Sequence, residues 1–179
     1  MLICIAVLIG AVPLIRYGYD QYFSAQYPLQ YQEYVSKAAQ EFDIEPSLIY
    51  AMIHTESGFD PHATSSANAR GLMQLTNDTF EWALQRAGEA GKYTTEDLYD
   101  PAINIHYGVY VISLLREQFE YTDTVLAAYN AGQGRVKQWL AVLSADGKTL
   151  PYIPYSETAE YIRRVNEAHA HYQQLYHLK

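Results

Sequence analysis

The chain has 179 residues, is 49% hydrophobic and carries a formal net charge of -8. This length suits one domain with a sizeable core, and the acidic balance argues against a nucleic-acid-binding protein, which needs a basic surface. The single cysteine, Cys4, excludes an internal disulfide. Tyrosine is frequent, with 18 residues against 5 phenylalanines, and suits either a sugar-holding groove or ordinary half-buried surface.

The N-terminus begins with an uncharged apolar run, residues 2–15, which ends at Arg16. As a helix this run spans roughly 21 Å, less than the hydrocarbon core of a bilayer of about 30 Å. It predicts a signal peptide or N-terminal membrane anchor over residues 1–15, with a buried core helix as the alternative. Residues 16–27 are aromatic and polar without a firm period, which favours a linker, so the domain is expected over residues 28–179.

Helix signals occupy most of the remaining chain. Proline suits a first helical position, and aspartate suits the position before it. Strand signals are weak, so we expect a mainly α fold with at most a short β-hairpin, for which the loop 144–154 is the candidate. The expected helices are Pro28 to Phe42, Glu45-Pro46 to Gly58, Asp78 (with Glu81 completing its cap) to about Gly88, Asp100-Pro101 to about Phe119, Asp123 to Gly132, about Gly134 to Leu143, and Ser156 to about Tyr176, the last with Glu160 and Arg164 paired.

One helix breaks its own apolar pattern. Ile49, Met52 and Ile53 repeat at helical spacing, and the next position in the series is Glu56, just before the helix ends at Gly58. Burial on an apolar face and the partial negative charge of a helix C-terminus both disfavour an ionised carboxyl and raise its pKa. A proton retained near neutral pH is what a general acid needs. The alternative is a frayed helix end from which Glu56 reaches water.

The segments that follow Glu56 contain four ordered motifs. They are "ESGFDPHATSSANARGLMQL" from residue 56, "LYDPAINIHYG" from residue 98, "AAYNAGQGRV" from residue 127 and "IPYSETAEYIRRV" from residue 153. Over roughly residues 30–177 the chain resembles the soluble lytic transglycosylases and goose-type lysozymes. The chain departs from that pattern at Asn68, where the family usually has Gly, and at Asn77, where it often has Pro. Asn tolerates a left-handed backbone, and the second change affects only a helix entry.

The resemblance implies a lysozyme-like multi-helix domain that cleaves the β-1,4 bond between N-acetylmuramic acid and N-acetylglucosamine in peptidoglycan. The expected partners are glycan strands and, through residues 1–15, a membrane, with no nucleic acid, metal or cofactor. The expected location is the bacterial cell envelope, after export, either tethered to the membrane or secreted. The chain is expected to be monomeric.

The resemblance also implies a set of site residues. Glu56 is the expected catalytic residue, and Gly71 and Gly132 are expected to be structural. Loop or helix-end hydrogen bonding is the alternative role for the amides in the set, and core packing for the tyrosines. Glu157 lies in a first helical turn, where the dipole favours a carboxylate, so it is a better hydroxyl acceptor than a second acid. The expected substrate-binding residues are Ser65, Met73, Gln74, Tyr129, Asn130, Glu157 and Tyr161.

Ordinary glycosidases use two carboxyl groups that flank the bond. Apart from Glu56, no carboxyl has a comparable apolar setting, because Asp60 and Asp78 have the spacing of turn and cap residues. The family resemblance implies that the substrate's N-acetyl oxygen assists, and that Glu56 then deprotonates the muramyl 6-hydroxyl to leave a 1,6-anhydro end. The alternatives are a lysozyme-type hydrolase and a non-catalytic peptidoglycan-binding module.

Overall fold

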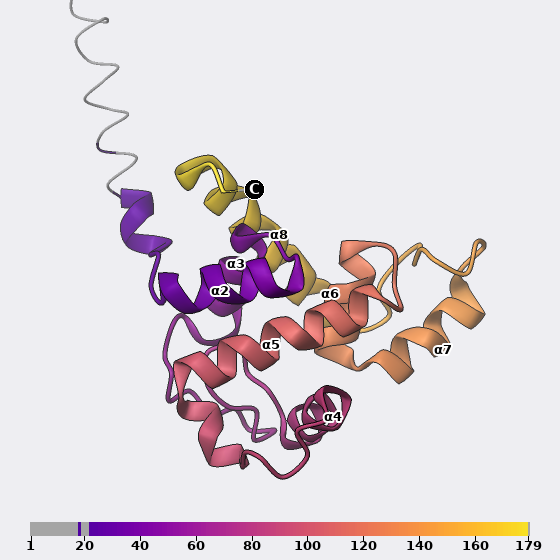
Figure 1. Cartoon of the computed structure of the whole chain (residues 1–179). Coiled ribbons are helices and arrows are strands. Elements are labelled where there is room, and N and C mark those ends of the chain that lie inside the picture. Colours follow the sequence, from indigo (N-terminus) through magenta and orange to yellow (C-terminus); the bar gives the residue numbers. More distant parts are fainter. Residues whose placement is uncertain (1–17, 19–21, 179) are drawn as a thin grey trace, which may run out of the picture.

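The computed structural model describes residue 18 and residues 22–178, and Figure 1 shows how its helices are arranged. The first fifteen residues, with the expected signal or anchor segment, lie outside the described residues. None of the described helices is both long and apolar enough to cross a membrane. The named elements are α2 (Gln32–Phe42), α3 (Pro46–Ser57), α4 (Asn77–Ala87), the 3-10 helix η1 (Thr95–Tyr99), α5 (Pro101–Arg116), α6 (Thr122–Ala131), α7 (Gln133–Leu143) and α8 (Ser156–Tyr176).

The expected mainly helical fold is confirmed, and several helix ends follow from local chemistry. Gly58 ends α3 in the left-handed conformation with φ 60°. Asp100 caps α5, because its carboxylate accepts from the backbone N–H groups of Ala102 and Ile103, with Pro101 in the first turn. The described residues contain only two isolated β-bridges, Thr64 to Arg70 and Arg70 to Leu75.

Two of the expected helix starts are wrong. The first described long helix begins at Gln32 rather than Pro28, because Tyr31 has a left-handed backbone with φ 57°. The cap of α4 is Thr76, whose hydroxyl accepts from the Thr79 N–H at 3.3 Å, and not Asp78.

The polar pairing expected at the starts of α4 and α8 also differs. Glu81 accepts from the Asn77 side chain at 3.0 Å instead of completing a capping box. On α8, Glu160 pairs with Arg163 at 2.5 Å rather than with Arg164. In both cases the observed partner lies one position along the helix from the expected one. Residues three and four apart on a helix are both within reach of a side chain, so either pair can form.

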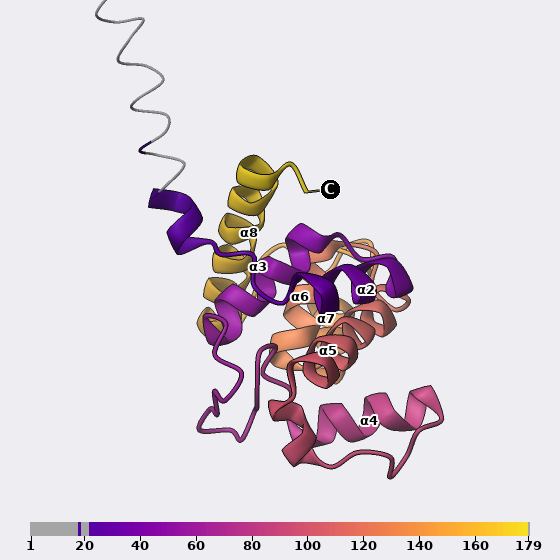
Figure 2. The same ribbon diagram turned by 60° about the vertical axis from the view of Figure 1, so that its left-hand side comes forward.

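The core forms around α3 and α5. Helix α5 is apolar on nearly all sides, as a helix enclosed by others must be, and its buried residues include Ile105, Val109 and Ile112. Helix α3 buries Ile49, Met52 and Ile53 completely. It packs along α8, and the two run side by side in Figures 1 and 2.

A long loop, residues 58–76, leaves the end of α3 and returns to α4, and it lies at one side of the molecule in Figure 2. Asn104 of α5 is fully buried and holds this loop. Its side chain accepts from Met73 N–H at 2.7 Å and donates to the carbonyls of Arg70 at 2.9 Å and Leu98 at 2.8 Å. Gly71 passes close by, so that a Cβ there would lie 2.2 Å from the Leu98 oxygen.

The end of the expected linker packs on the domain. Residues 22–26 are helical, and Tyr27 stacks on His54 of α3 and His171 of α8, with ring centroids 4.8 and 4.6 Å apart. Tyr176 donates from its hydroxyl to the Tyr27 carbonyl at 2.7 Å, and His54 Nε2 lies 3.1 Å from the Gln26 carbonyl. We call these residues (Gln26, Tyr27, His54, His171, Tyr176) the aromatic clamp. Residues 22–27 are therefore part of the folded unit.

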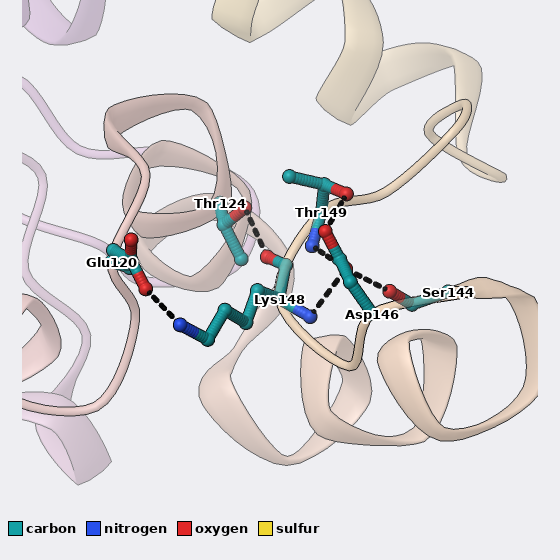
Figure 3. Close-up of polar contacts among 6 residues, drawn as sticks. All are labelled: Glu120, Thr124, Ser144, Asp146, Lys148 and Thr149. Atoms are coloured by element: carbon teal, nitrogen blue, oxygen red, sulfur yellow. Dashed lines mark hydrogen bonds and ion pairs between the residues drawn. The ribbon is translucent and has the colours of Figure 1, made fainter.

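The loop between α7 and α8 has no strand among its described residues, so the hairpin that it could have held is absent. Asp146 organises it (Figure 3), since its carboxylate accepts from the backbone N–H groups of Lys148 and Thr149, both at 2.8 Å. These hydrogen bonds hold the pKa of Asp146 well below its usual range. Lys148 reaches Glu120 at 2.7 Å, which ties the loop to the start of α6.

Candidate active site

Glu56 lies in the last turn of α3, where its side chain is largely withdrawn from solvent. Burial raises its pKa to about 7, and the Tyr161 hydroxyl and the Arg164 charge oppose that rise. The carboxyl is therefore partly protonated and partly ionised near neutral pH. A group in this condition can give up a proton and take one back without a large free-energy cost in either direction.

Two tyrosines flank Glu56. Tyr129 of α6 donates from its hydroxyl to the Met73 carbonyl at 2.8 Å, so it joins α6 to the loop. Tyr161 of α8 is 2% exposed, and its hydroxyl has no hydrogen-bond partner of ordinary geometry among the described residues. The pKa of each tyrosine is raised well above its usual value, first by burial and then by the charge of Glu56. Both hydroxyls therefore stay neutral, and that of Tyr161 is free to donate towards the carboxyl.

Arg164 is a neighbour of Glu56 that sequence reasoning missed. It is exposed on α8, and its charge favours the ionised form of Glu56 and lowers the pKa of that carboxyl. The spacing of Glu157, Tyr161 and Arg164 is four and then three residues, which places all three on one side of a helix. That spacing is the signal in the sequence that could have identified Arg164.

The loop residues of the expected site make contacts within the loop or the core. Ser65 accepts at its hydroxyl from the N–H groups of Ala67 and Ala69, at 3.2 and 3.1 Å. Gln74 donates from its amide nitrogen to the Gly71 carbonyl at 2.9 Å and to the Ala63 carbonyl at 3.2 Å.

Met73 is fully buried, and its sulfur would lie 2.4 Å from a Cβ added to Gly108. Ser57 donates from its hydroxyl to the Leu72 carbonyl at 2.9 Å, which fixes the end of α3 against the same loop. Contacts with α3, α5 and α6 thus hold this loop against the end of α3 that carries Glu56.

The ends of α6 and α8 meet at Asn130. Thr158, which is buried, donates from its hydroxyl to the Asn130 side-chain oxygen at 2.7 Å. Asn130 itself is exposed, and Glu157 is exposed in the first turn of α8. Asn130 and Glu157 are thus both exposed at this junction, and the amide nitrogen of Asn130 has no recorded partner among the described residues. Thr158 belongs to the fourth sequence motif but was not among the expected site residues.

Two hollows bear on the position of the site. A groove of about 180 Å³ between α4 and α6 is lined by Tyr129, Gly132 and Gln133 together with Asp78 and Trp82, so it begins at the tyrosine beside Glu56. A larger groove of about 600 Å³ between α2 and α5 is lined by none of the expected site residues. Of these two grooves, the smaller one includes an expected site residue, Tyr129. Among the described residues no group of three or more His, Cys, Asp or Glu side chains is arranged to hold a metal ion.

The family profile described as Transglycosylase SLT domain matches residues 33–149. The membrane-bound lytic murein transglycosylase C of Haemophilus influenzae (strain PittGG) is 38% identical over 134 residues, which cover 69% of this chain and 36% of the relative. The protein of the same name from Serratia proteamaculans (strain 568) is 31% identical over 170 residues, which cover 80% of this chain and 47% of the relative. The chain therefore spans less than half the length of these relatives.

Among solved structures, the 70 kDa soluble lytic transglycosylase of Escherichia coli superposes with a TM-score of 0.78 at 30% sequence identity. The match covers 85% of this chain and 25% of that one. The likeness extends beyond the residues matched by the family profile and includes most of the described helices.

Proposed function

The chain belongs to the Transglycosylase SLT domain family, and on that premise we propose that it is a lytic transglycosylase acting on the glycan strands of peptidoglycan. The bond to be cleaved is the β-1,4 bond between N-acetylmuramic acid and N-acetylglucosamine. The proposal includes export to the bacterial cell envelope, with residues 1–15 as signal peptide or anchor, and action as a monomer.

The observation that carries the proposal is the state of Glu56. Its pKa of about 7 keeps a proton available at neutral pH, and the two neighbouring tyrosine hydroxyls are neutral. A surface carboxylate in a simple ion pair has its pKa lowered, so the opposite shift of Glu56 favours an acid that donates a proton.

In the proposed reaction Glu56 first donates its proton to the bridging oxygen, and the bond between that oxygen and the anomeric carbon breaks. The oxygen of the substrate's N-acetyl group bonds to that carbon from the face opposite the leaving oxygen. Glu56, now a carboxylate stabilised by Tyr161 and Arg164, then removes the proton of the muramyl 6-hydroxyl. The 6-oxygen bonds to the anomeric carbon, the N-acetyl oxygen leaves, and a 1,6-anhydro end results without consumption of water.

The other site residues have supporting roles in this proposal. Asn130 and Glu157 bind sugar hydroxyls or N-acetyl groups at the solvent-facing junction of α6 and α8. Gln74 contributes its side-chain oxygen, since its nitrogen is engaged within the loop. Ser65 and Met73 shape the loop, Tyr129 joins the loop to α6, and Tyr161 orients the carboxyl of Glu56.

The test is product analysis. The chain and its Glu56→Gln variant are incubated with purified peptidoglycan, and the released muropeptides are identified by mass spectrometry. We expect anhydro products, each lighter by one water than the corresponding hydrolysis product, from the wild type. We expect a loss of rate of at least about a hundred-fold in the variant, because the proton donor is absent.

Two other results would contradict the proposal in different ways. Reducing ends in place of anhydro ends would indicate a hydrolase of the lysozyme type. Absence of any cleavage, with equal glycan binding by the wild type and Glu56→Gln, would indicate a binding module.

A further inference from the structure

Thr158 and Asn130 form a polar contact between the start of α8 and the end of α6. The Thr158 side chain is 2% exposed, and its hydroxyl donates to the Asn130 side-chain oxygen at 2.7 Å. Asn130 itself is exposed in the last turn of α6. The contact therefore ties one end of an exposed amide to a buried hydroxyl.

The direction of this hydrogen bond follows from the protons that the two groups carry. A threonine hydroxyl has one proton to donate, whereas the oxygen of an asparagine amide only accepts and its nitrogen only donates. Asn130 is the recorded acceptor for the Thr158 hydroxyl among the described residues. With the amide reversed, the buried hydroxyl would be left without an acceptor, which folded proteins avoid. The amide is therefore most stable with its oxygen towards Thr158.

This orientation decides what Asn130 can offer to a ligand. The amide oxygen is directed to Thr158, so the nitrogen on the opposite side of the same carbon is the atom left for a ligand, and it donates. Glu157, the residue before Thr158, is exposed and its carboxylate accepts. An N-acetyl group has one carbonyl oxygen and one N–H, and the outward nitrogen of Asn130 suits the carbonyl oxygen.

The contact lies within one helical turn of a residue that acts on Glu56. Thr158 and Tyr161 are three residues apart on α8, a separation that places both on the same face of a helix. Tyr161 is buried, and its hydroxyl lowers the pKa of the Glu56 carboxyl. On α6, Asn130 directly follows Tyr129, whose own pKa is raised by burial and by the charge of Glu56. Each of the two joined residues thus has a neighbour on its own helix that interacts with Glu56.

We propose that Thr158 is a positioning residue, which holds the Asn130 amide with its nitrogen outward to donate to the carbonyl oxygen of an N-acetyl group of the glycan. The inference rests on the proposed function for its substrate. Thr158 itself contacts no sugar and acts through Asn130. Without the Thr158 hydroxyl the amide can reverse, and the oxygen that it then presents repels the carbonyl oxygen of the ligand.

The experiment measures calorimetric binding of a soluble β-1,4-linked oligomer of N-acetylglucosamine to the chain with Glu56→Gln. We expect Thr158→Val, which keeps the shape but removes the hydroxyl, to weaken binding by about ten-fold. Thr158→Ser restores the hydroxyl and should restore most of the affinity. In the enzyme with Glu56 intact, Thr158→Val should act mostly on KM for peptidoglycan, whereas general loss of structure would lower kcat as well.

A second variant tests the outward atom without removing the Thr158 hydrogen bond. In Asn130→Asp the carboxylate still accepts from Thr158, but it presents an oxygen to the ligand in place of the nitrogen, so binding should again weaken by about ten-fold. Addition of Thr158→Val to Asn130→Asp should then cause less than about a two-fold further loss, because both changes remove the same donor. The control is Gln138→Glu, which adds one negative charge at an exposed position of α7 and should leave binding unchanged.

The outcomes separate this inference from the proposed function. If the variants behave as expected while the wild type forms no anhydro product, the role of Thr158 is supported and the proposed function is not. The inference is overturned if anhydro products form but Thr158→Val or Asn130→Asp binds the oligomer as tightly as the Glu56→Gln parent. Failure of Thr158→Ser to restore affinity, additive losses in the double variant, or no binding of the oligomer by the parent would overturn it as well.

Discussion

At the scale of single residues, three opposing effects set the protonation of Glu56. Burial raises its pKa, whereas the Tyr161 hydroxyl and the Arg164 charge lower it, with a net value of about 7. With burial alone, Glu56 would keep its proton and would rarely be available as a carboxylate. With a strong ion pair alone, it would be a permanent carboxylate with no proton to donate. The reaction proposed for Glu56 needs both states in turn, and the balance between these effects supplies them.

Removing Arg164 should move this balance. Because the arginine favours the ionised form of Glu56, Arg164→Gln should raise the pKa of Glu56 above about 7. Activity that needs the protonated acid is lost as pH rises through that pKa, so the alkaline limb of the kcat/KM profile should move to higher pH. Arg164 is exposed, so we expect a shift of about half a pH unit. Arg163→Gln is the control, since Arg163 pairs with Glu160 and Glu167; an equal shift in both variants would contradict the assignment.

At the scale of elements, the loop 58–76 depends on contacts that are remote in sequence. Asn104 of α5 makes three hydrogen bonds to backbone groups of Arg70, Met73 and Leu98. Gly71 leaves the space that this arrangement needs. The loop therefore has its conformation because α5 and η1 hold it, and its own turn-forming residues contribute only part of that stability.

Substitution of Gly71 should lower the free energy of unfolding by much more than its positive φ alone would explain. In Gly71→Ala the new Cβ would lie 2.2 Å from the Leu98 oxygen and 2.3 Å from the Asn104 amide nitrogen, so the loop must shift. We expect a loss of about 3 kcal/mol in the free energy of unfolding, measured by urea denaturation. Gly91→Ala is the control, because Gly91 also has a positive φ but has open space at its Cβ; it should cost about 1 kcal/mol. Equal costs would show that the close approach at Gly71 is unimportant.

At the scale of the whole molecule, the aromatic clamp joins the N-terminal segment to α3 and α8. Tyr27 lies between His54 and His171, and burial followed by the charge of His171 lowers the pKa of His54, partly offset by its contact with the Gln26 carbonyl. The folded state thus favours neutral His54. The stability that neutral His54 contributes is fully present above the pKa that histidine has in the unfolded chain. It is lost as the pH falls through the lower pKa of His54 in the folded chain.

The clamp should accordingly loosen in acid. We expect amide hydrogen exchange of residues 22–27, corrected for the intrinsic rate, to increase as pH falls below 6.5, the ordinary pKa of histidine. His54→Phe keeps an aromatic ring against Tyr27 but does not titrate, so it should remove most of this pH dependence. A wild-type segment whose protection stays constant down to pH about 5 would contradict the account.

The sequence allowed the parts of this fold that depend on near neighbours to be predicted. The end of α3 at Gly58, the cap at Asp100 and the left-handed backbone at Asn68, with φ 57°, all follow from local residue chemistry. Thr76 shows the limit of that reasoning, because two good cap residues lay close together and only packing decides between them.

Contacts between distant segments could not be predicted. The loop contacts of Asn104 and the docking of Tyr27 each join residues far apart in the chain. The pattern of Ile49, Met52 and Ile53 gave reason to expect a raised pKa at Glu56, but not the residues that limit the rise. Those residues come from α8, at the other end of the sequence.

The clamp also has a mechanical consequence. Residues 22–27 and the C-terminal end of α8 lie together at one end of the molecule, and α4 lies at the other (Figures 1 and 2). If the expected anchor over residues 1–15 lies in a membrane, only residues 16–21 separate it from the folded unit, which begins at residue 22. Six residues span at most about 20 Å, so the domain would act on cell wall close to the membrane. Loosening of the clamp in acid would add residues 22–27 to this connection and extend that reach.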